Sequence, residues 1–297
     1  MNFKAKSFFA SEMISWDLAR ENYANLQFVE RKVVDFERFN VEVHFNPSRI
    51  FSAAADVDEN SIAARKCFLC AQNRPKAQQA VDCGHFELLV NPYPIFPEHF
   101  TIASKQHEIQ QIKGYFADFL YFAHELNDFV VFFNAADCGA SAPDHLHFQA
   151  GTKNYLPLIK DYNNLKISIL QNNNFEIFTI KNYLRTVFCV EAASPQDAET
   201  GFNFLYGKIS TAPLESARIN LLAFFEDGKY YVFVFPRRAF RPRQYFAENE
   251  RERLIISPGT VEMSGILITP VKSHFDKITA ADIADIYGQV SAALVKF

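Results

Sequence analysis

Residues 139–151, "GASAPDHLHFQAG", decide how the rest of the chain is interpreted. They follow an apolar run, "FVVFFNAAD" (129–137), and place His145, His147 and Gln149 at every second position. Side chains of an extended strand alternate between its two faces, so these three polar residues are expected on one face and the apolar residues between them on the other. The pattern predicts a strand with one polar face and one buried face.

Such a strand has the chemistry needed to handle phosphate. A neutral imidazole such as that of His147 can attack phosphorus when one ring nitrogen donates to a backbone carbonyl and the other presents its lone pair. The amide of Gln149 could hold a phosphate oxygen without adding charge. Ahead of the strand, a loop of small residues begins at Asn134, and its backbone N–H groups at Gly139 and hydroxyl at Ser141 could cradle phosphate oxygens.

For a single strand histidine the alternative is a satisfied, half-buried side chain, and this is what we expect of His44 and His124. The triplet of two histidines and a glutamine behind a Gly-Ala-Ser loop favours a functional role instead.

A second motif, "CFLC" at residues 67–70, has the Cys-x-x-Cys spacing of a zinc knuckle. One knuckle supplies half of a tetrahedral site, so two more ligands are required. The candidates downstream are His85, His99, His107 and His145. A pair of buried thiols is the alternative, whereas a redox pair is disfavoured because no suitable strand-to-helix context follows.

Composition limits the function classes. The chain has 297 residues, 49% of them apolar, with 32 Phe to build a core and a formal charge of −4 that disfavours nucleic acid or an anionic membrane as a partner. The five cysteines argue against a disulfide framework. The N-terminal residues do not form a signal peptide, and no apolar run approaches the roughly 18 residues of a membrane span, so we expect a cytoplasmic address.

Periodicity predicts an α+β protein with two successive halves of comparable size. The expected elements are a helix in 7–26, a hairpin in 28–45, a polar surface excursion at 52–66, two strands around a proline-rich turn in 85–104, a helix over 107–128, a strand at 129–137, a loop at 152–164, strands at 175–180 and 184–192, a helix at 198–210, a hairpin in 217–236, and a glycine turn, strand and helix over 256–294.

Three segments together resemble the transferase branch of the histidine-triad superfamily: "CFLCAQNRP" (67–75), "NPYPIFPEHFTIASKQH" (91–107) and "GASAPDHLHFQA" (139–150). That branch includes galactose-1-phosphate uridylyltransferase, diadenosine tetraphosphate phosphorylase and GDP-L-galactose phosphorylase, and "HLHFQA" looks most like the last of these. The resemblance implies a predominantly antiparallel sheet with flanking helices and two fused halves. Residues 1–160 would form the catalytic half and residues 161–297 a degenerate half that completes the pocket in one compact unit.

The resemblance also implies roles for individual residues. His147 would be the nucleophile that becomes covalently nucleotidylated, and Gln149 would steady the phosphate of that intermediate. A structural zinc would be held by Cys67, Cys70, His107 and His145. Asn91 would contact the ribose and Arg49 the nucleotide, with a turn-forming residue and a solvated strand-end charge as the respective alternatives.

The chain departs from the family pattern in two places. Asp144 lies between the proline of the loop and the first histidine, which makes the loop one residue longer. In the second half, Arg237, Arg238 and Arg241, with Arg243, form the strongest local cationic cluster without matching a family motif. Because arginine pairs bidentately with phosphate, we expect this cluster to bind substrate, with a solvated basic edge as the alternative.

The resulting hypothesis is a nucleotidyltransferase or phosphorylase that works through a nucleotidyl-His147 intermediate. Its donor would be a nucleoside diphosphate sugar or a dinucleotide, and its acceptor phosphate or a sugar phosphate. One alternative is a hydrolase of nucleotide conjugates, which Gln149 in place of a third histidine argues against. Another is an inactive, zinc-stabilised nucleotide-binding module. No nucleic-acid or membrane partner is expected, and a homodimer is possible.

Overall fold

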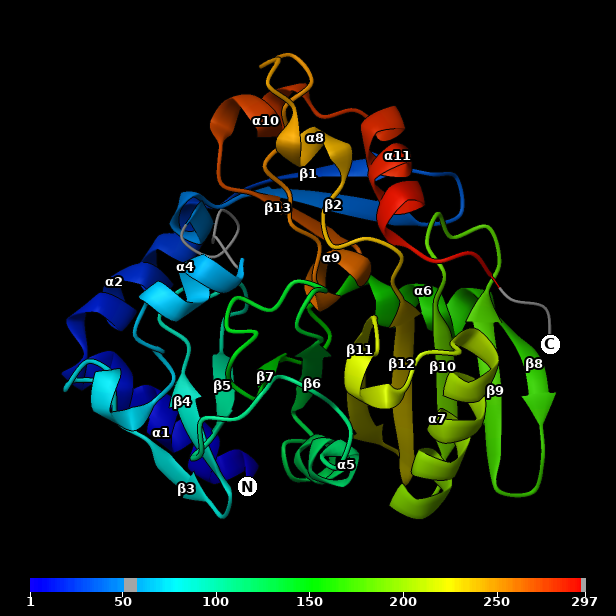
Figure 1. The fold of residues 1–297 in the computed structure, drawn as a ribbon, viewed down its shortest axis with the longest axis horizontal. Coiled ribbons are helices and arrows are strands. Elements are labelled where there is room, and N and C mark those ends of the chain that lie inside the picture. Colours follow the sequence, from blue (N-terminus) through cyan, green and yellow to red (C-terminus); the bar gives the residue numbers. More distant parts are fainter. Residues whose placement is uncertain (51–57, 295–297) are drawn as a thin grey trace.

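A ten-stranded antiparallel sheet forms the centre of the molecule (Figure 1). The structure is a computed structural model and describes residues 1–50 and 58–294, so residues 52–57 of the predicted surface excursion lie outside the described residues. The sheet has the order β3-β4-β5-β7-β6-β11-β12-β10-β9-β8. Its strands are β3 (Val81–Cys83), β4 (Phe86–Val90), β5 (His99–Ser104), β6 (Phe129–Asn134), β7 (His147–Thr152), β8 (Lys166–Gln171), β9 (Phe175–Ile180), β10 (Phe188–Ala192), β11 (Ile219–Glu226) and β12 (Lys229–Pro236).

The two halves of this sheet have the same topology. Strands β3 to β7 run in the order β3-β4-β5-β7-β6, and strands β8 to β12 run, from the other edge inward, in the order β8-β9-β10-β12-β11. In each half one helix, α5 (Phe116–Glu125) or α7 (Pro195–Ile209), joins the third strand to the fourth. The halves meet where β6 pairs with β11. The predicted α+β architecture, with a mainly antiparallel sheet and two halves, is confirmed.

One face of the sheet is covered by helices. The amphipathic helices α5 and α7 lie side by side on it, where the rings of Phe116 and Phe202 stack with their centroids 4.2 Å apart. The N-terminal helix α1 (Asn2–Ser15) packs on β4, and α2 (Asp17–Ala24) follows it. The apolar residues of β7, which include Phe148, point into this core.

The opposite face is covered by a smaller sheet, in which two strands from the first part of the sequence pair with one from the last part. The hairpin of β1 (Glu30–Asp35) and β2 (Asn40–Phe45) has the C-terminal strand β13 (Ile266–Thr269) parallel to β2. Short helices surround it: α4 (Glu59–Ala64), α6 (Pro157–Leu165), α8 (Arg243–Phe246), α9 (Thr260–Met263), α10 (Lys272–Lys277) and α11 (Ala280–Val290). Strand β13, from the second half of the chain, thus completes a sheet that β1 and β2 begin in the first half.

The predicted helix over 107–128 is too long at its N-terminal end. Only α5 is helical, and residues 107–115 form a loop that ends beside Gly114, whose φ is 83°. Backbone groups of this loop pair with the segment before β7: Leu146 N–H donates to Glu108 O at 2.7 Å, and Gln110 N–H donates to Pro143 O at 3.3 Å. These tertiary contacts take the hydrogen bonds that a helix would have used.

Three smaller expectations are also corrected. The helix predicted in 7–26 is divided into α1 and α2 at Trp16, which is extended (φ −121°, ψ 98°). The expected loop at 152–164 contains α6, which begins at Pro157, a residue that suits the first turn of a helix. Strand β8 was not predicted from the sequence, because it is an edge strand with only partly buried side chains.

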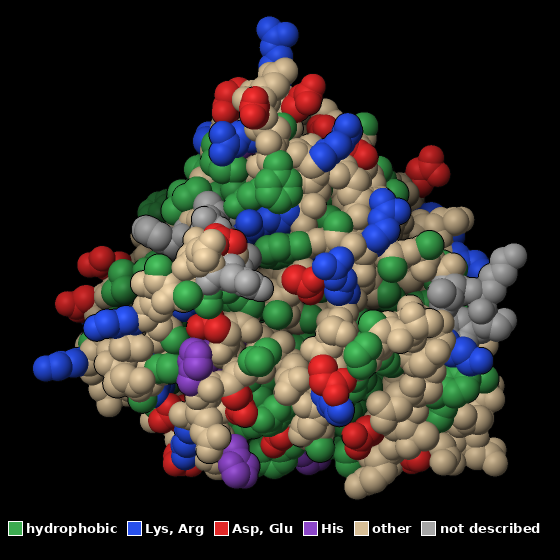
Figure 2. Space-filling view, viewed as in Figure 1, with side chains coloured by type: hydrophobic (Ala, Val, Ile, Leu, Met, Phe, Trp, Pro, Cys, Tyr) green, Lys and Arg blue, Asp and Glu red, His purple; other side chains and the backbone are tan. Residues whose placement is uncertain are grey.

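Charged side chains of both signs are mixed over the face shown in Figure 2. In the described part of the chain, none of the helices has the length and apolarity needed to cross a membrane.

At Gly139, a loop of the first half packs closely against a loop of the second half. The φ of this glycine is +99°, and a Cβ built there would lie 2.7 Å from Gly259 Cα and 3.0 Å from Pro258 O. Gly84 has a similar φ of +78° but open space around it. A comparison of substitutions at Gly139 and Gly84 therefore separates the energetic cost of a left-handed backbone from the cost of a steric clash.

We predict that Gly84→Ala lowers the free energy of unfolding by about 1–2 kcal/mol, the cost of a left-handed Cβ. Gly139→Ala should cost at least about 2 kcal/mol more, because backbone atoms of the other half must also move. Urea denaturation of both variants measures the difference. Equal losses would show that the contact between the two loops is not tight.

Candidate active site

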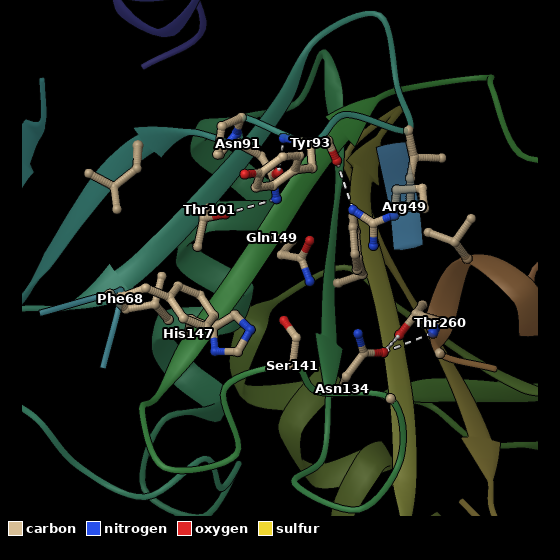
Figure 3. Close-up of a pocket in the computed structure, with 18 of the residues that line it drawn as sticks. Arg49, Phe68, Asn91, Tyr93, Thr101, Asn134, Ser141, His147, Gln149 and Thr260 are labelled. Carbon is tan, nitrogen blue, oxygen red and sulfur yellow. Dashed lines mark hydrogen bonds between the residues drawn. The ribbon is translucent and has the colours of Figure 1, made fainter. Parts of the chain in front are cut away.

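A cavity of about 580 Å³ lies between the ten-stranded sheet and the smaller sheet. Both halves of the chain line it. The first half contributes Trp16, Leu18, Arg49, Arg65, Phe68, Leu69, Leu89, Asn91, Tyr93, Thr101, Asn134, Gly139, Ser141, His147 and Gln149 among others, and the second half contributes Ser257, Gly259, Thr260, Val261, Glu262 and Ile268. The cavity therefore collects the predicted phosphate-handling residues into one site (Figure 3).

His147 is held in one tautomer. It is the first residue of β7, and its Nδ1–H donates to the backbone oxygen of His145 at 2.8 Å. Nε2 therefore keeps its lone pair. The ring is only 4% exposed, and burial lowers the pKa of His147 to about 4. An uncharged imidazole with a free Nε2 lines the cavity at neutral pH.

Gln149 is oriented by His99, a residue whose role the sequence did not predict. The backbone N–H of Ile95 donates to His99 Nδ1 at 3.2 Å, so the ring proton of His99 is on Nε2. That Nε2–H donates to Gln149 Oε1 at 3.0 Å. Burial, with Arg49 nearby, lowers the pKa of His99 to about 3 and keeps the ring neutral. With its oxygen anchored, the amide turns its nitrogen toward Ser141 (Figure 3).

Asn134 is anchored in the same way at the end of β6. Its Oδ1 accepts from Asn220 Nδ2 at 2.8 Å, from Thr260 N–H at 2.8 Å and from Thr260 Oγ1 at 2.7 Å. The side-chain nitrogen of Asn134 is left on the cavity side, opposite that of Gln149 (Figure 3). Two neutral amide donors and the hydroxyl of Ser141 thus surround the space beside His147.

Charged side chains lie on either side of these neutral donors. Arg49 lines the cavity and donates from Nη1 to Tyr93 O at 2.7 Å. Glu262 also lines it; burial raises the pKa of this carboxyl, against an opposing effect of Arg49. Arg65, a third lining residue, forms an ion pair with Asp144. This ion pair holds Asp144, the extra residue of the loop, beside a side chain that lines the cavity.

One end of the cavity is apolar. Trp16, Leu69 and Leu89 are buried there, and Phe68, with 47% of its surface exposed, lies next to His147 (Figure 3). Such an aromatic face can accept a planar ring.

Asn91 lines the same cavity, but it also stabilises the turn after β4. Its Oδ1 accepts from Tyr93 N–H at 3.0 Å and its Nδ2 donates to Thr101 Oγ1 at 3.2 Å.

The predicted arginine cluster of the second half is not among the residues that line the cavity. Arg237 is buried, and all five of its N–H groups donate to the backbone oxygens of 239, 240, 258 and 290 or to Asn220 Oδ1. Arg238 is exposed, and Arg241 donates to Ser257 Oγ and stacks on Phe240 and Tyr245. Arg237 therefore supports the loop at 257–259 from behind and has no donor left for a ligand.

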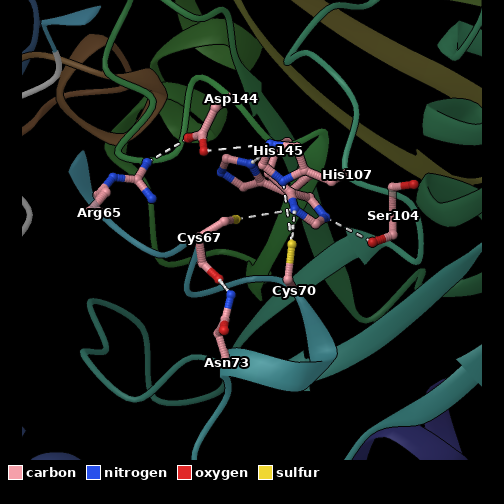
Figure 4. Close-up of polar contacts among 9 residues, drawn as sticks. Arg65, Cys67, Cys70, Asn73, Ser104, His107, Asp144 and His145 are labelled. Carbon is pink, nitrogen blue, oxygen red and sulfur yellow. Dashed lines mark hydrogen bonds and ion pairs between the residues drawn. The ribbon is translucent and has the colours of Figure 1, made fainter. Parts of the chain in front are cut away.

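The structure brings Cys67, Cys70, His107 and His145 together, with ligand atoms all within 4.8 Å of one another (Figure 4). Cys67 Sγ lies 3.2 Å from His145 Nδ1, and Cys70 Sγ lies 3.3 Å from His107 Nδ1. His145 donates from Nε2 to the backbone oxygen of Ser104 at 2.8 Å, which leaves Nδ1 for the cluster. Burial opposes ionisation of the Cys67 thiol, but hydrogen bonds, first that with His145, lower its pKa to about 6. The group can hold a metal ion.

The two other histidines proposed as ligands lie elsewhere. His85 is exposed before β4, and His99 faces Gln149. The position of His99 could have been anticipated once β5 was paired with β7, because the register joins Thr101 to Gln149 and puts residues 99 and 149 on one face. For Gln110, by contrast, no sequence signal was available, since it is a single residue whose partners come from distant segments. Glu262 was also missed, although its side chain accepts from the backbone N–H of Gly259 only three residues before it.

Residues 8–152 match a family described as a domain of unknown function, DUF4922. No curated protein is detectably similar in sequence.

Among solved structures, yeast Ap4A phosphorylase Apa2 is 13% identical with a TM-score of 0.57, over 92% of this chain and 93% of that chain. Apa2 in complex with AMP is 14% identical with a TM-score of 0.58, over 95% and 93%. A DUF4931 family protein from Bacillus cereus is 14% identical with a TM-score of 0.40, over 56% and 88%. The likeness to Apa2 extends over nearly the whole chain, and the histidine-triad-like fold that the motifs predicted is confirmed.

Proposed function

We propose that the protein is a nucleotidyltransferase of the phosphorylase type, with His147 as the nucleophile. The observation that carries this proposal is the Nδ1–H bond from His147 to His145 O, which leaves Nε2 unprotonated in a cavity lined by neutral phosphate-binding groups. The fold shared with an Ap4A phosphorylase, one structure of which holds AMP, supports a nucleotide as the transferred group.

In the first step, His147 Nε2 attacks the α-phosphorus of a nucleoside diphosphate sugar or a dinucleotide. A P–N bond forms, and the bond from phosphorus to the bridging oxygen breaks. The sugar phosphate or remaining nucleotide leaves with that oxygen. Anchored amide donors of Gln149 and Asn134 and the hydroxyl of Ser141 would hold the phosphate oxygens, where preorganised dipoles are most effective.

In the second step, an oxygen of phosphate or of a sugar phosphate attacks the same phosphorus, and the P–N bond breaks. The nucleotide leaves on the acceptor, and His147 Nε2 regains its lone pair. The phosphoramidate preserves the energy of the donor bond only if water is kept away. Because His147 is only 4% exposed, in a cavity between the two sheets, the site suits transfer better than hydrolysis.

The two ends of the cavity suit the two parts of the donor. The apolar end with Phe68 would take the nucleoside, with Asn91 toward the ribose. Arg49 and Thr260 lie on the other side of His147 and would contact the departing group or the acceptor, so we assign Arg49 to that part of the donor in place of the nucleotide contact that the resemblance implies. Gly139 and Gly259 let the loops of both halves approach closely enough to close this second part. We therefore propose a catalytic half at 1–160 and a supporting half at 161–297.

The four-residue cluster fits a structural zinc ion. Zinc bonds of roughly 2.3 Å to sulfur and 2.0 Å to nitrogen place tetrahedral ligands about 3.6 Å apart, close to the 3.2 and 3.3 Å observed between sulfur and nitrogen. Cys67, Cys70, His107 and His145 would fill all four positions, so the ion would hold the loop beside the nucleophile and take no part in the reaction.

The test of function is covalent labelling. The protein is mixed, without acceptor, with Ap4A and with UDP-, GDP- and ADP-sugars labelled at the α-phosphate. A transferase traps a protein-bound nucleotide that is acid-labile and base-stable, a hydrolase releases free monophosphate, and a binding module does neither. The donor that labels fastest also identifies the base.

We predict that His147→Ala abolishes the adduct while the melting temperature changes little, because the ring borders a cavity and removes little core packing. His124→Ala, an exposed histidine on α5, is the control and should label normally. Intact-mass spectrometry counts the bound nucleotide. An adduct that persists in His147→Ala would rule out this nucleophile.

We predict that Gln149→Ala slows adduct formation by roughly 10²–10³-fold, the usual effect of removing one preorganised donor. Gln149→Glu should slow it at least as much, since a carboxylate repels phosphate. Gln106→Ala, on an exposed loop, is the matched control. Rapid-quench measurement of a single turnover gives the rates, and a Gln149→Ala rate within error of wild type would remove the proposed role.

We predict that Cys67→Ser and His107→Ala each abolish tight binding of the one zinc ion per chain. The lost binding should reduce stability by about 4 kcal/mol and the melting temperature by about 10 °C. His85→Ala, which removes a histidine outside the cluster, should keep its zinc. Elemental analysis and thermal unfolding measure both effects. Full zinc occupancy in either cluster variant would contradict the ligand set.

A further inference from the structure

The pairing of β6 with β7 stops two residues short of His147, the proposed nucleophile. The register joins Phe129 to Thr152 and continues to Phe132 opposite Gln149. One further hydrogen-bonded pair in the same register would join Asn134 to His147, the last residue of one strand and the first of the other. That pair is not formed.

The side-chain amide of Gln110 occupies the position of the missing pair. Its Oε1 accepts from His147 N–H at 2.8 Å. Its Nε2 donates to His147 O at 3.0 Å and to Asn134 O at 2.8 Å. Gln110 is only 2% exposed. A primary amide has the same donor and acceptor groups as a peptide bond, so it can satisfy backbone groups of both strands while keeping them apart.

We propose that Gln110 is the positioning residue of the nucleophile: its amide holds β6 and β7 apart at their cavity end and fixes the backbone of His147. The inference rests on the proposed function of His147, and it adds a residue that does not itself line the cavity.

Separation of the strands at this point has two effects. It makes room for the side chains of Asn134 and Gln149, which project from the two strands into the cavity. It also fixes residues 145–147, whose extended backbone brings His145 O to within 2.8 Å of His147 Nδ1. The tautomer of the nucleophile thus depends on a backbone segment that Gln110 clamps.

Gln110 also connects the nucleophile to the predicted metal cluster. His107 lies three residues before it, and the intervening Glu108 O accepts from Leu146 N–H at 2.7 Å. The loop at 107–110 and the segment at 142–147 are therefore joined along their lengths, and the side chain of Gln110 forms the last connection, at His147 itself.

The sharpest variant is Gln110→Glu, which has nearly the same shape. When ionised, its carboxylate still accepts from His147 N–H, but it has no proton to donate and faces the carbonyl oxygens of His147 and Asn134. The variant is therefore measured at alkaline pH, because burial raises the pKa of a carboxyl at this position. We expect single-turnover adduct formation with the fastest-labelling donor of the panel to fall about 10²-fold, as for a nucleophile displaced by about 1 Å. The donor concentration at half-maximal rate should change less than about threefold, because the cavity-lining side chains remain.

The matched control is Gln111→Glu, at the next residue, which lines a separate cavity. Its rate of adduct formation should match that of wild type.

Two readouts do not need turnover. In protein labelled with ¹⁵N-histidine, the His147 ring should be a single Nδ1–H tautomer in wild type and a mixture of tautomers in Gln110→Glu. Amide exchange at His147 should be as slow as at Gln149 in wild type and at least tenfold faster in the variant, while exchange at Gln149 changes little.

The outcomes are distinct. A rate within twofold of wild type in Gln110→Glu overturns the proposal. So does a variant in which the rate and the stability fall while the half-saturating donor concentration rises with them, because the role would then be merely structural. If wild type forms no adduct with any probe, the proposed function fails, and the tautomer and exchange data alone decide the position of Gln110. If Gln110→Glu does not fold, slow wild-type exchange at His147 supports the proposal and fast exchange overturns it.

Discussion

The hydrogen bond from His147 Nδ1–H to the backbone oxygen two residues before it is the interaction on which the site depends. It determines which ring nitrogen keeps a lone pair, and it exists only while residues 145–147 stay extended. The contacts that hold that short segment include His145 Nε2–H donating to Ser104 O, Leu146 N–H donating to Glu108 O, and Gln110 bonded to the backbone of His147. A metal ion in the cluster would add a further contact through His145. The ring of His147 is thus oriented by its own strand, and the surrounding loops keep that strand in place.

Around this imidazole the cavity offers neutral dipoles more than charges. The oxygens of Gln149 and Asn134 are occupied by buried partners, His99 in one case and Thr260 in the other, so each amide has one orientation. Such donors would require no reorganisation as negative charge developed in the proposed transfer at phosphorus. The low pKa of His99 follows first from its burial and keeps this anchor uncharged. A chain with a net charge of −4 can in this way hold an anionic group without a large basic surface.

The repeated topology explains how the second half comes to line the cavity although it has no counterpart of the His-x-His-x-Gln triplet. Joined edge to edge through β6 and β11, it places the loop at 257–262 over the end of β6, where Gly259 packs against Asn134. Arg237, expected to bind substrate, holds this loop from behind through Pro258 O. Its charge is buried among neutral acceptors because five backbone and amide oxygens together satisfy one guanidinium.

The sequence by itself determined the local features: the alternation that puts His147 and Gln149 on one face of a strand, the Cys-x-x-Cys pair, the hairpins, and the α+β order of two halves. Each depends on spacing within a few residues, which strand and turn geometry convert directly into structure. Only the tertiary structure decided that His99 orients Gln149, that residues 107–115 form a loop, and that Arg237 lies behind the cavity. Gln110 shows the reason most clearly, because its partners are 24 and 37 residues away and a buried amide takes its role from whichever backbone groups the fold leaves unpaired beside it.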